Sequence, residues 1–73
     1  MKYIIKIYFN GIHWDDSYTD DKTEAEYIKS YMEDKSRSVW DRANESALID
    51  FIQDYNIQCV ENIEITVEIV EDN

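Results

Sequence analysis

The chain has 73 residues, and its 17 Asp and Glu outnumber its 7 Lys and Arg, which gives a formal net charge of −10. A chain of this length forms one domain, here 1–73, and its hydrophobic content of 44% excludes a disordered tail. The acid excess argues against direct binding to nucleic acid or to an anionic membrane, because both require surface cations, and it favours a basic partner.

The single cysteine, Cys59, excludes an intramolecular disulfide and a zinc site built on two thiolates, and we expect it to be a buried, inert thiol. The apolar run in residues 1–11 is interrupted by Lys6 and lacks a cleavage site of small residues, so we expect no signal peptide. No apolar run is long enough to span a bilayer. Because a lone thiol suits a reducing compartment, we expect a cytoplasmic protein.

The N-terminal segment predicts a β-hairpin. Residues 2–9 are rich in β-branched and aromatic side chains, and the dipeptide Asn10-Gly11 that follows favours a two-residue type I′ turn. Such a turn predicts the cross-strand pairs Phe9–Ile12, Tyr8–His13, Ile7–Trp14 and Lys6–Asp15. In this register Ile7 and Trp14 lie on the buried face, whereas His13 and Asp15 lie on the outer face.

A first helix is predicted to begin near Thr23, because Thr23 and Glu26 have capping-box spacing, and to end around Lys35. The polar segment 34–40, DKSRSVW, favours a break in the helix. A second helix is then predicted to run to about Tyr55. Its apolar stripe consists of Leu48, Phe51, Ile52 and Tyr55, extended backwards by Trp40, Ala43 and Ala47.

Asn56 is a plausible stop for the second helix, since asparagine tolerates the left-handed conformation. Residues 57–60 either form a short strand of their own or only connect. In 63–69, isoleucine and valine alternate with glutamate and threonine, which predicts a strand with one buried and one acidic face. The expected fold is therefore α+β: a two-layer sandwich of a β-hairpin, one or two helices and a C-terminal strand. The helices would cover one face of a three-stranded, mainly antiparallel sheet.

The sequence offers no catalytic constellation, so we expect a protein that is not an enzyme and needs no cofactor. His13 is the only histidine and is expected to face solvent beside Tyr8, and a single glycine cannot form a phosphate-binding loop. Four aspartates, Asp15, Asp16, Asp20 and Asp21, crowd into seven residues without a Lys or Arg. They allow three interpretations: a solvated loop with a helix N-terminus, a docking surface for a cationic partner, or a metal site. Their spacing does not match an EF-hand, and we expect no metal.

Acids also recur at like-charge positions elsewhere. Asp50 and Asp54 are four residues apart on a predicted helix, and Glu64 and Glu68 share the open face of the last strand. Such an array either serves solubility alone or imitates the phosphates of a nucleic acid. Three tyrosines predicted to lie off the core, Tyr8, Tyr27 and Tyr31, suit an interface, although they can also cover core edges.

A small, acidic, single-domain chain without a catalytic constellation resembles phage- and mobile-element-encoded inhibitors of bacterial defence, of the anti-CRISPR or anti-restriction type. The resemblance lies in composition and in no motif: the chain is rich in Ile, Lys, Tyr, Asn, Asp and Glu, with one Gly and no Pro. It implies a phage protein that acts in the cytoplasm of a bacterial host cell, as a DNA mimic in several such families. It carries over no site residue.

The function that we expect is therefore non-enzymatic inhibition. Acidic side chains would dock into the basic, nucleic-acid-binding groove of a partner protein such as a CRISPR effector. The alternative is a small structural or regulatory module that self-associates through apolar surface, with acidity serving solubility. The expected partner contacts are Asp15, Asp16, Asp20, Asp21, Glu24, Glu64 and Glu68, with Tyr8, Tyr27 and Tyr31 as apolar anchors.

Overall fold

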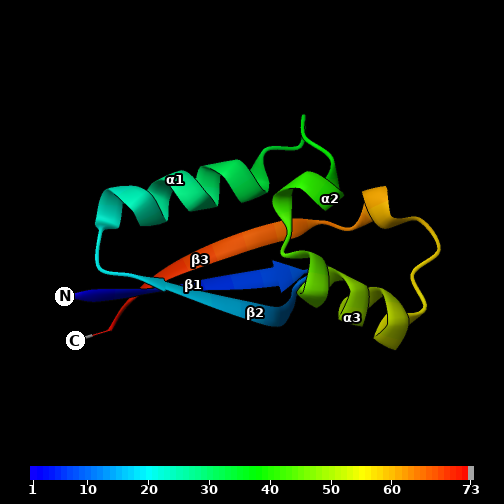
Figure 1. Cartoon of the computed structure of the whole chain (residues 1–73), viewed down its shortest axis with the longest axis horizontal. Coiled ribbons are helices and arrows are strands. Elements are labelled where there is room, and N and C mark those ends of the chain that lie inside the picture. The colour runs from blue at the N-terminus through cyan, green and yellow to red at the C-terminus, as the bar shows by residue number, and fades with distance from the viewer. Residues whose placement is uncertain (73) are drawn as a thin grey trace.

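A computed structural model describes residues 1–72, which form a small α+β domain with a three-stranded sheet (Figure 1). The strand order is β2-β1-β3 and both pairings are antiparallel, so the predicted fold class is confirmed. The two long helices, α1 and α3, lie along β3 and near the turn end of β2 respectively (Figure 1). In chain order the elements are β1 (Lys2–Phe9), β2 (Ile12–Thr19), α1 (Lys22–Glu33), α2 (Val39–Arg42), α3 (Glu45–Tyr55), the 3-10 turn η1 (Val60–Asn62) and β3 (Ile65–Asp72).

The core lies between the sheet and the helices. Alternate residues of β1 point into it, and the predicted inward face of that strand is buried along its whole length. Phe9 packs edge-on against Phe51 of α3, with ring centroids 5.2 Å apart. The buried set is Tyr3, Ile5, Ile7, Phe9, Ala25, Met32, Val39, Leu48, Phe51, Ile63, Ile65 and Val67.

The hairpin turn is confirmed, but the register beyond it is wrong by one residue. Asn10 and Gly11 adopt φ values of 52° and 80°, as a type I′ turn requires, and Tyr8 pairs with His13. A β-bulge then shifts β2, so that Ile7 pairs with Asp15 and Lys6 with Asp16.

The bulged residue is Trp14. Its indole ring packs against Phe51 at 5.0 Å, and its Nε1 donates a hydrogen bond of 2.9 Å to the carbonyl of Ala47. These contacts to α3 account for the extra residue in β2. The bulge leaves Trp14 unpaired so that its large ring reaches the helix, and the pairing with β1 resumes at Asp15. As a consequence, Asp15 shares the helix-covered face of the sheet with Ile7, and Asp16 takes the open face.

The first helix begins at Lys22, one residue before the predicted start at Thr23, and has a different cap. Asp21 is the N-cap residue and accepts hydrogen bonds from the backbone N–H groups of Thr23 and Glu24, so the capping box of Thr23 and Glu26 does not form. The helix ends at Glu33, and the predicted break after it is confirmed.

The predicted second helix is two helices. Ser38 caps α2 and Asn44 caps α3, and an extended Ala43 lies between them. Asn44 accepts from the N–H of Ala47, and this local bond competes with continuation of α2. Trp40 is 46% exposed and does not extend the buried stripe.

Asn56 ends α3 in the left-handed conformation with φ 49°, as predicted. Residues 57–60 form no strand; Val60 opens the single turn of η1. Cys59 precedes this turn and is exposed, so the expectation of a buried thiol was wrong. Its segment runs over the outside of the molecule, where apolar spacing does not predict burial.

Candidate protein-interaction surface

The sheet has one face without helices, and this open face gathers three of the expected partner contacts. Tyr8, Asp16 and Glu68 come from β1, β2 and β3, and each is more exposed than the inward residues on either side of it. The register places Lys6 opposite both Asp16 and Glu68. Tyr8 donates a hydrogen bond of 3.0 Å from its hydroxyl to Oε1 of Glu68. That bond to a carboxylate is the main cause of a raised pKa of Tyr8.

His13 lies on the same face, as predicted, with its ring 5.3 Å from that of Tyr8. Its Nε2 is 2.6 Å from Oδ1 of Asp16. Sequence analysis placed Lys6 on this face but opposite Asp15; it missed the His13–Asp16 pair and the position of Lys6 opposite Asp16 and Glu68. Spacing gave no signal for the pair, because residues three apart in a regular strand lie on opposite faces and only the bulge at Trp14 brings His13 and Asp16 together; the position of Lys6 follows from the cross-strand register.

The other aspartates of the cluster have separate local contacts. Asp15 is half-buried and accepts a hydrogen bond of 3.0 Å from the backbone N–H of Asp16. Asp21 caps α1, and Glu24 lies in the first turn of that helix, where the helix dipole favours an acid. Asp20 is exposed. The structure therefore does not bring the four aspartates into one patch, and no group of three metal-ligating side chains within residues 1–72 is arranged to hold a metal ion.

The remaining expected contacts lie on other sides of the molecule. Glu64 exchanges hydrogen bonds of 2.8 Å with Asn10 through its backbone and has Lys35 Nζ at 3.9 Å from its carboxylate. Tyr27 and Tyr31 neighbour one another on α1, and the guanidinium of Arg37 lies 4.6 Å above the Tyr31 ring. Tyr27 is 67% exposed.

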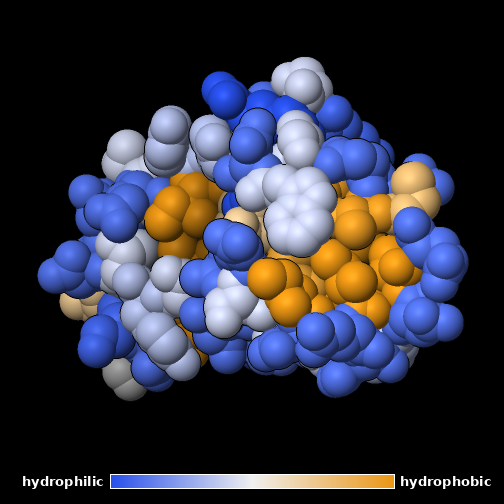
Figure 2. All heavy atoms as spheres, turned by 45° about the vertical axis from the view of Figure 1, so that its right-hand side comes forward, coloured by the Kyte–Doolittle hydropathy of each residue, from blue (hydrophilic) through white to orange (hydrophobic). Residues whose placement is uncertain are grey.

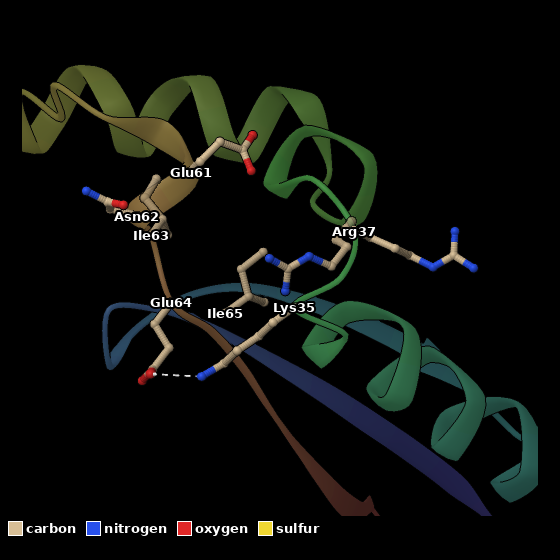
Figure 3. A pocket seen from close by; sticks show the side chains of 8 residues that line it. Lys35, Arg37, Glu61, Asn62, Ile63, Glu64 and Ile65 are labelled. Atoms are coloured by element: carbon tan, nitrogen blue, oxygen red, sulfur yellow. Dashed lines mark ion pairs between the residues drawn. The ribbon is translucent and has the colours of Figure 1, made fainter.

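A pocket of about 310 Å³ opens between the end of α1 and the start of β3 (Figure 3). Lys35 points across it towards Glu64, whereas Arg37 points away from it (Figure 3). Arg42, which also lines it, donates to the carbonyl of Met32 at 2.8 Å and so joins α2 to α1.

The one other acid in this pocket, Glu61, is held by its neighbours. It accepts hydrogen bonds from the N–H of Val39 at 3.0 Å and from the hydroxyl of Ser38 at 2.8 Å. These bonds lower the pKa of Glu61, and the bond from the Val39 N–H has the larger effect. The polar contacts of this pocket are thus internal structural bonds and the Lys35–Glu64 pair.

An apolar surface is the feature that sequence analysis missed. Trp40 and Ile49 are 46% and 38% exposed, and Tyr55 is also exposed. Apolar side chains gather on the face of the molecule that α2, α3 and the segment before β3 form (Figure 2). Ile49 lies off the predicted stripe of α3, and this position was the available signal.

No family model, curated protein or solved structure matches the chain. Within the described residues, none of the helices has the length and apolar character needed to cross a membrane.

Proposed function

We propose that the protein is a non-enzymatic inhibitor that docks its acidic surface into the basic, nucleic-acid-binding groove of a partner protein. A CRISPR effector of a bacterial host is such a partner, and the protein would then act as an anti-CRISPR that mimics DNA. The observation that carries the proposal is the surplus of carboxylates. Only three of the 17 acids, Glu33, Asp34 and Glu64, form ion pairs with Lys or Arg within residues 1–72, and a fourth, Asp16, contacts the His13 ring. The other thirteen carboxylates form no ion pair in this part of the chain; Asp21, Glu61 and Glu68 are among those that accept internal hydrogen bonds, and the rest are left for an external cationic partner.

The open face of the sheet would form the centre of the contact with the partner. Asp16 and Glu68 flank Lys6, and Tyr8 adds an aromatic ring with a polar hydroxyl beside them. The carboxylates of Asp16 and Glu68 contact neighbouring side chains, His13 and Tyr8, whereas the carboxylates of Asp15 and Asp21 accept bonds from backbone N–H groups.

The test begins with the tagged protein as bait in a bacterial lysate and elution by a salt gradient. We expect a nucleic-acid-binding protein that elutes as salt rises, because contacts between exposed charges are screened. In a competition assay the protein should then displace duplex DNA from the protein recovered. A recovered protein that binds duplex DNA equally well in its presence would contradict the mimicry.

The site itself is tested with the double variant Asp16→Asn/Glu68→Gln. Its affinity for the recovered protein should fall by about tenfold or more, since charges in a desolvated contact set affinity. The matched control is Glu26→Gln/Glu71→Gln, which makes the same change in net charge at exposed positions off the open face. Equal affinities for the two double variants would show that net charge alone matters.

A second candidate function is a module that self-associates through apolar surface. It is favoured by the exposure of Trp40, Ile49 and Tyr55. Sedimentation at low and high salt separates the two candidates, because a homodimer of this kind would persist at high salt.

A further inference from the structure

The surface of α2, α3 and the segment before β3 is held together by specific bonds. Glu61 of η1 bonds to Ser38 and Val39 at the start of α2, and the N–H of Ile57 bonds to the carbonyl of Ile52 at the end of α3. These bonds place η1 against α2 and residue 57 against α3. We define the α2–α3 patch as Trp40, Ile49, Ile52, Ile57 and Val60.

Ile52, Ile57 and Val60 pack against the core with one side and are half-buried, whereas Trp40 and Ile49 are the exposed members of the patch. The core positions of these elements are filled by Val39, Leu48 and Phe51, each of which is almost completely buried. Ile49 and Ile52 lie beside this buried stripe, one helical turn apart, and Trp40 follows Val39 on the outside of α2. Apolar side chains gather in this region and polar side chains border them (Figure 2). An exposed, polar-rimmed apolar area of this kind marks a contact site.

The charge around the patch decides what fits it. The same elements carry four acids that form no ion pair within the described residues, Asp41, Glu45, Asp50 and Asp54, a fifth acid, Glu61, whose carboxylate is bound to Ser38 and Val39, and one base, Arg42. Arg42 turns inward to the carbonyl of Met32 and does not balance them. In a dimer through this patch, the acids of one copy would face the same acids of the other, and each copy carries a net charge of −10. The repulsion between them disfavours self-association.

We propose that the α2–α3 patch binds an amphipathic segment of the partner, one whose apolar face is bordered by Lys or Arg. Ile49 and Ile52 would receive apolar side chains spaced as on a helix, while the surrounding acids would meet the cations. This inference rests on the proposed function, since it assigns to the same cationic partner a second, apolar contact outside the open face of the sheet.

The test uses three probes of equal length: a leucine–lysine peptide that forms an amphipathic helix, its scrambled isomer, and oligolysine. Titrations of the isotope-labelled protein, followed by amide chemical shifts, give both affinity and location. We expect the amphipathic peptide to bind about tenfold or more tightly than the other two, with shifts in α2, α3 and residues 57–60. Ile49→Ser should reduce that affinity by about tenfold. The matched control Tyr18→Ser, at an exposed side chain on the opposite, open face, should leave it unchanged.

Three outcomes would overturn the inference. Equal affinity for the amphipathic peptide and oligolysine, with shifts confined to the open face, would remove the apolar contact but leave the acidic docking surface. If none of the probes binds, the apolar contact is also ruled out. The lysate experiment decides separately whether a cationic partner exists. A dimer in sedimentation that Ile49→Ser dissociates would show that a second copy covers the patch.

Discussion

The indole Nε1 of Trp14 donates a hydrogen bond of 2.9 Å to the carbonyl oxygen of Ala47, and this bond joins the hairpin to α3. The same ring packs against Phe51 at 5.0 Å and against Tyr55 at 5.8 Å. The bulge in β2 therefore serves the tertiary contact. It also sends Asp15 to the helix side and leaves Asp16 beside His13 on the open face.

Trp14→Phe tests this relationship, because it removes the indole donor but keeps an aromatic ring. We expect a loss of about 1 kcal/mol in the free energy of unfolding, the usual contribution of one hydrogen bond. In a domain of this size that corresponds to a fall in Tm of about 4–8 °C, measured by circular dichroism. The control Trp40→Phe, at an exposed ring, should change Tm little. Equal losses for the two variants would mean that the Trp14–Ala47 bond adds nothing specific.

Gly11→Val tests the turn. Gly11 has φ 80°, and a Cβ atom at this position would meet no atom within 4 Å. The cost is therefore backbone strain and not a clash, and we expect a loss of about 1–3 kcal/mol by urea unfolding. Gly11→Asn should lose much less, because asparagine accepts the left-handed conformation. If the Val and Asn variants unfold at the same urea concentration, backbone strain at position 11 is not the cause of the lost stability.

The pH dependence of stability tests the contacts of Glu61. Its pKa is lowered from the ordinary value of 4.5, chiefly by the Val39 N–H, so folding favours the charged form. The stabilisation is complete above pH 4.5 and is lost as pH falls through the lower, folded-state pKa. Glu61→Gln should therefore lower Tm at neutral pH, and the difference from the unmodified protein should shrink in acid. A difference that is constant from neutral pH into acid would show that the charge of Glu61 has no part in the effect.

Glu33→Ala tests how the edge of the sheet is covered. Oε2 of Glu33 accepts from the backbone N–H of Val67 at 2.9 Å, and Lys29 donates to the Val67 carbonyl at 2.7 Å. These two side chains also form an ion pair, and together they satisfy both outward backbone groups of Val67 in an edge strand. We expect a loss of about 1–3 kcal/mol by urea unfolding, since the bond to a charged acceptor is lost.

The control for this edge contact is Glu26→Ala, at an exposed position on the same helix, which should be nearly neutral. Gel filtration at rising concentration adds a second measurement, because an uncovered edge favours association between copies. If the Glu33 and Glu26 variants have the same free energy of unfolding and both stay monomeric in gel filtration, the side chains of α1 do not shield the edge of β3 from association.

Local sequence determined the elements. The turn at Asn10-Gly11, the alternation in β3 and the left-handed end of α3 at Asn56 follow from backbone sterics and periodicity within a few residues. The break after α1 is of the same kind, because a polar segment has no apolar face to bury. These features can be predicted because their causes lie close together in the chain.

Tertiary structure decided the rest. Trp14 is bulged because Phe51 and Ala47, more than thirty residues later, form the surface that it packs on. That shift by one residue exchanged the faces of Asp15 and Asp16, so that Asp16 lies on the open face, and placed Lys6 between Asp16 and Glu68. The exposure of Trp40, which was predicted to extend the buried stripe, was settled in the same way, because the core accepts only as many apolar side chains as its volume holds. Such outcomes depend on register and packing among distant residues, which spacing along the chain does not encode.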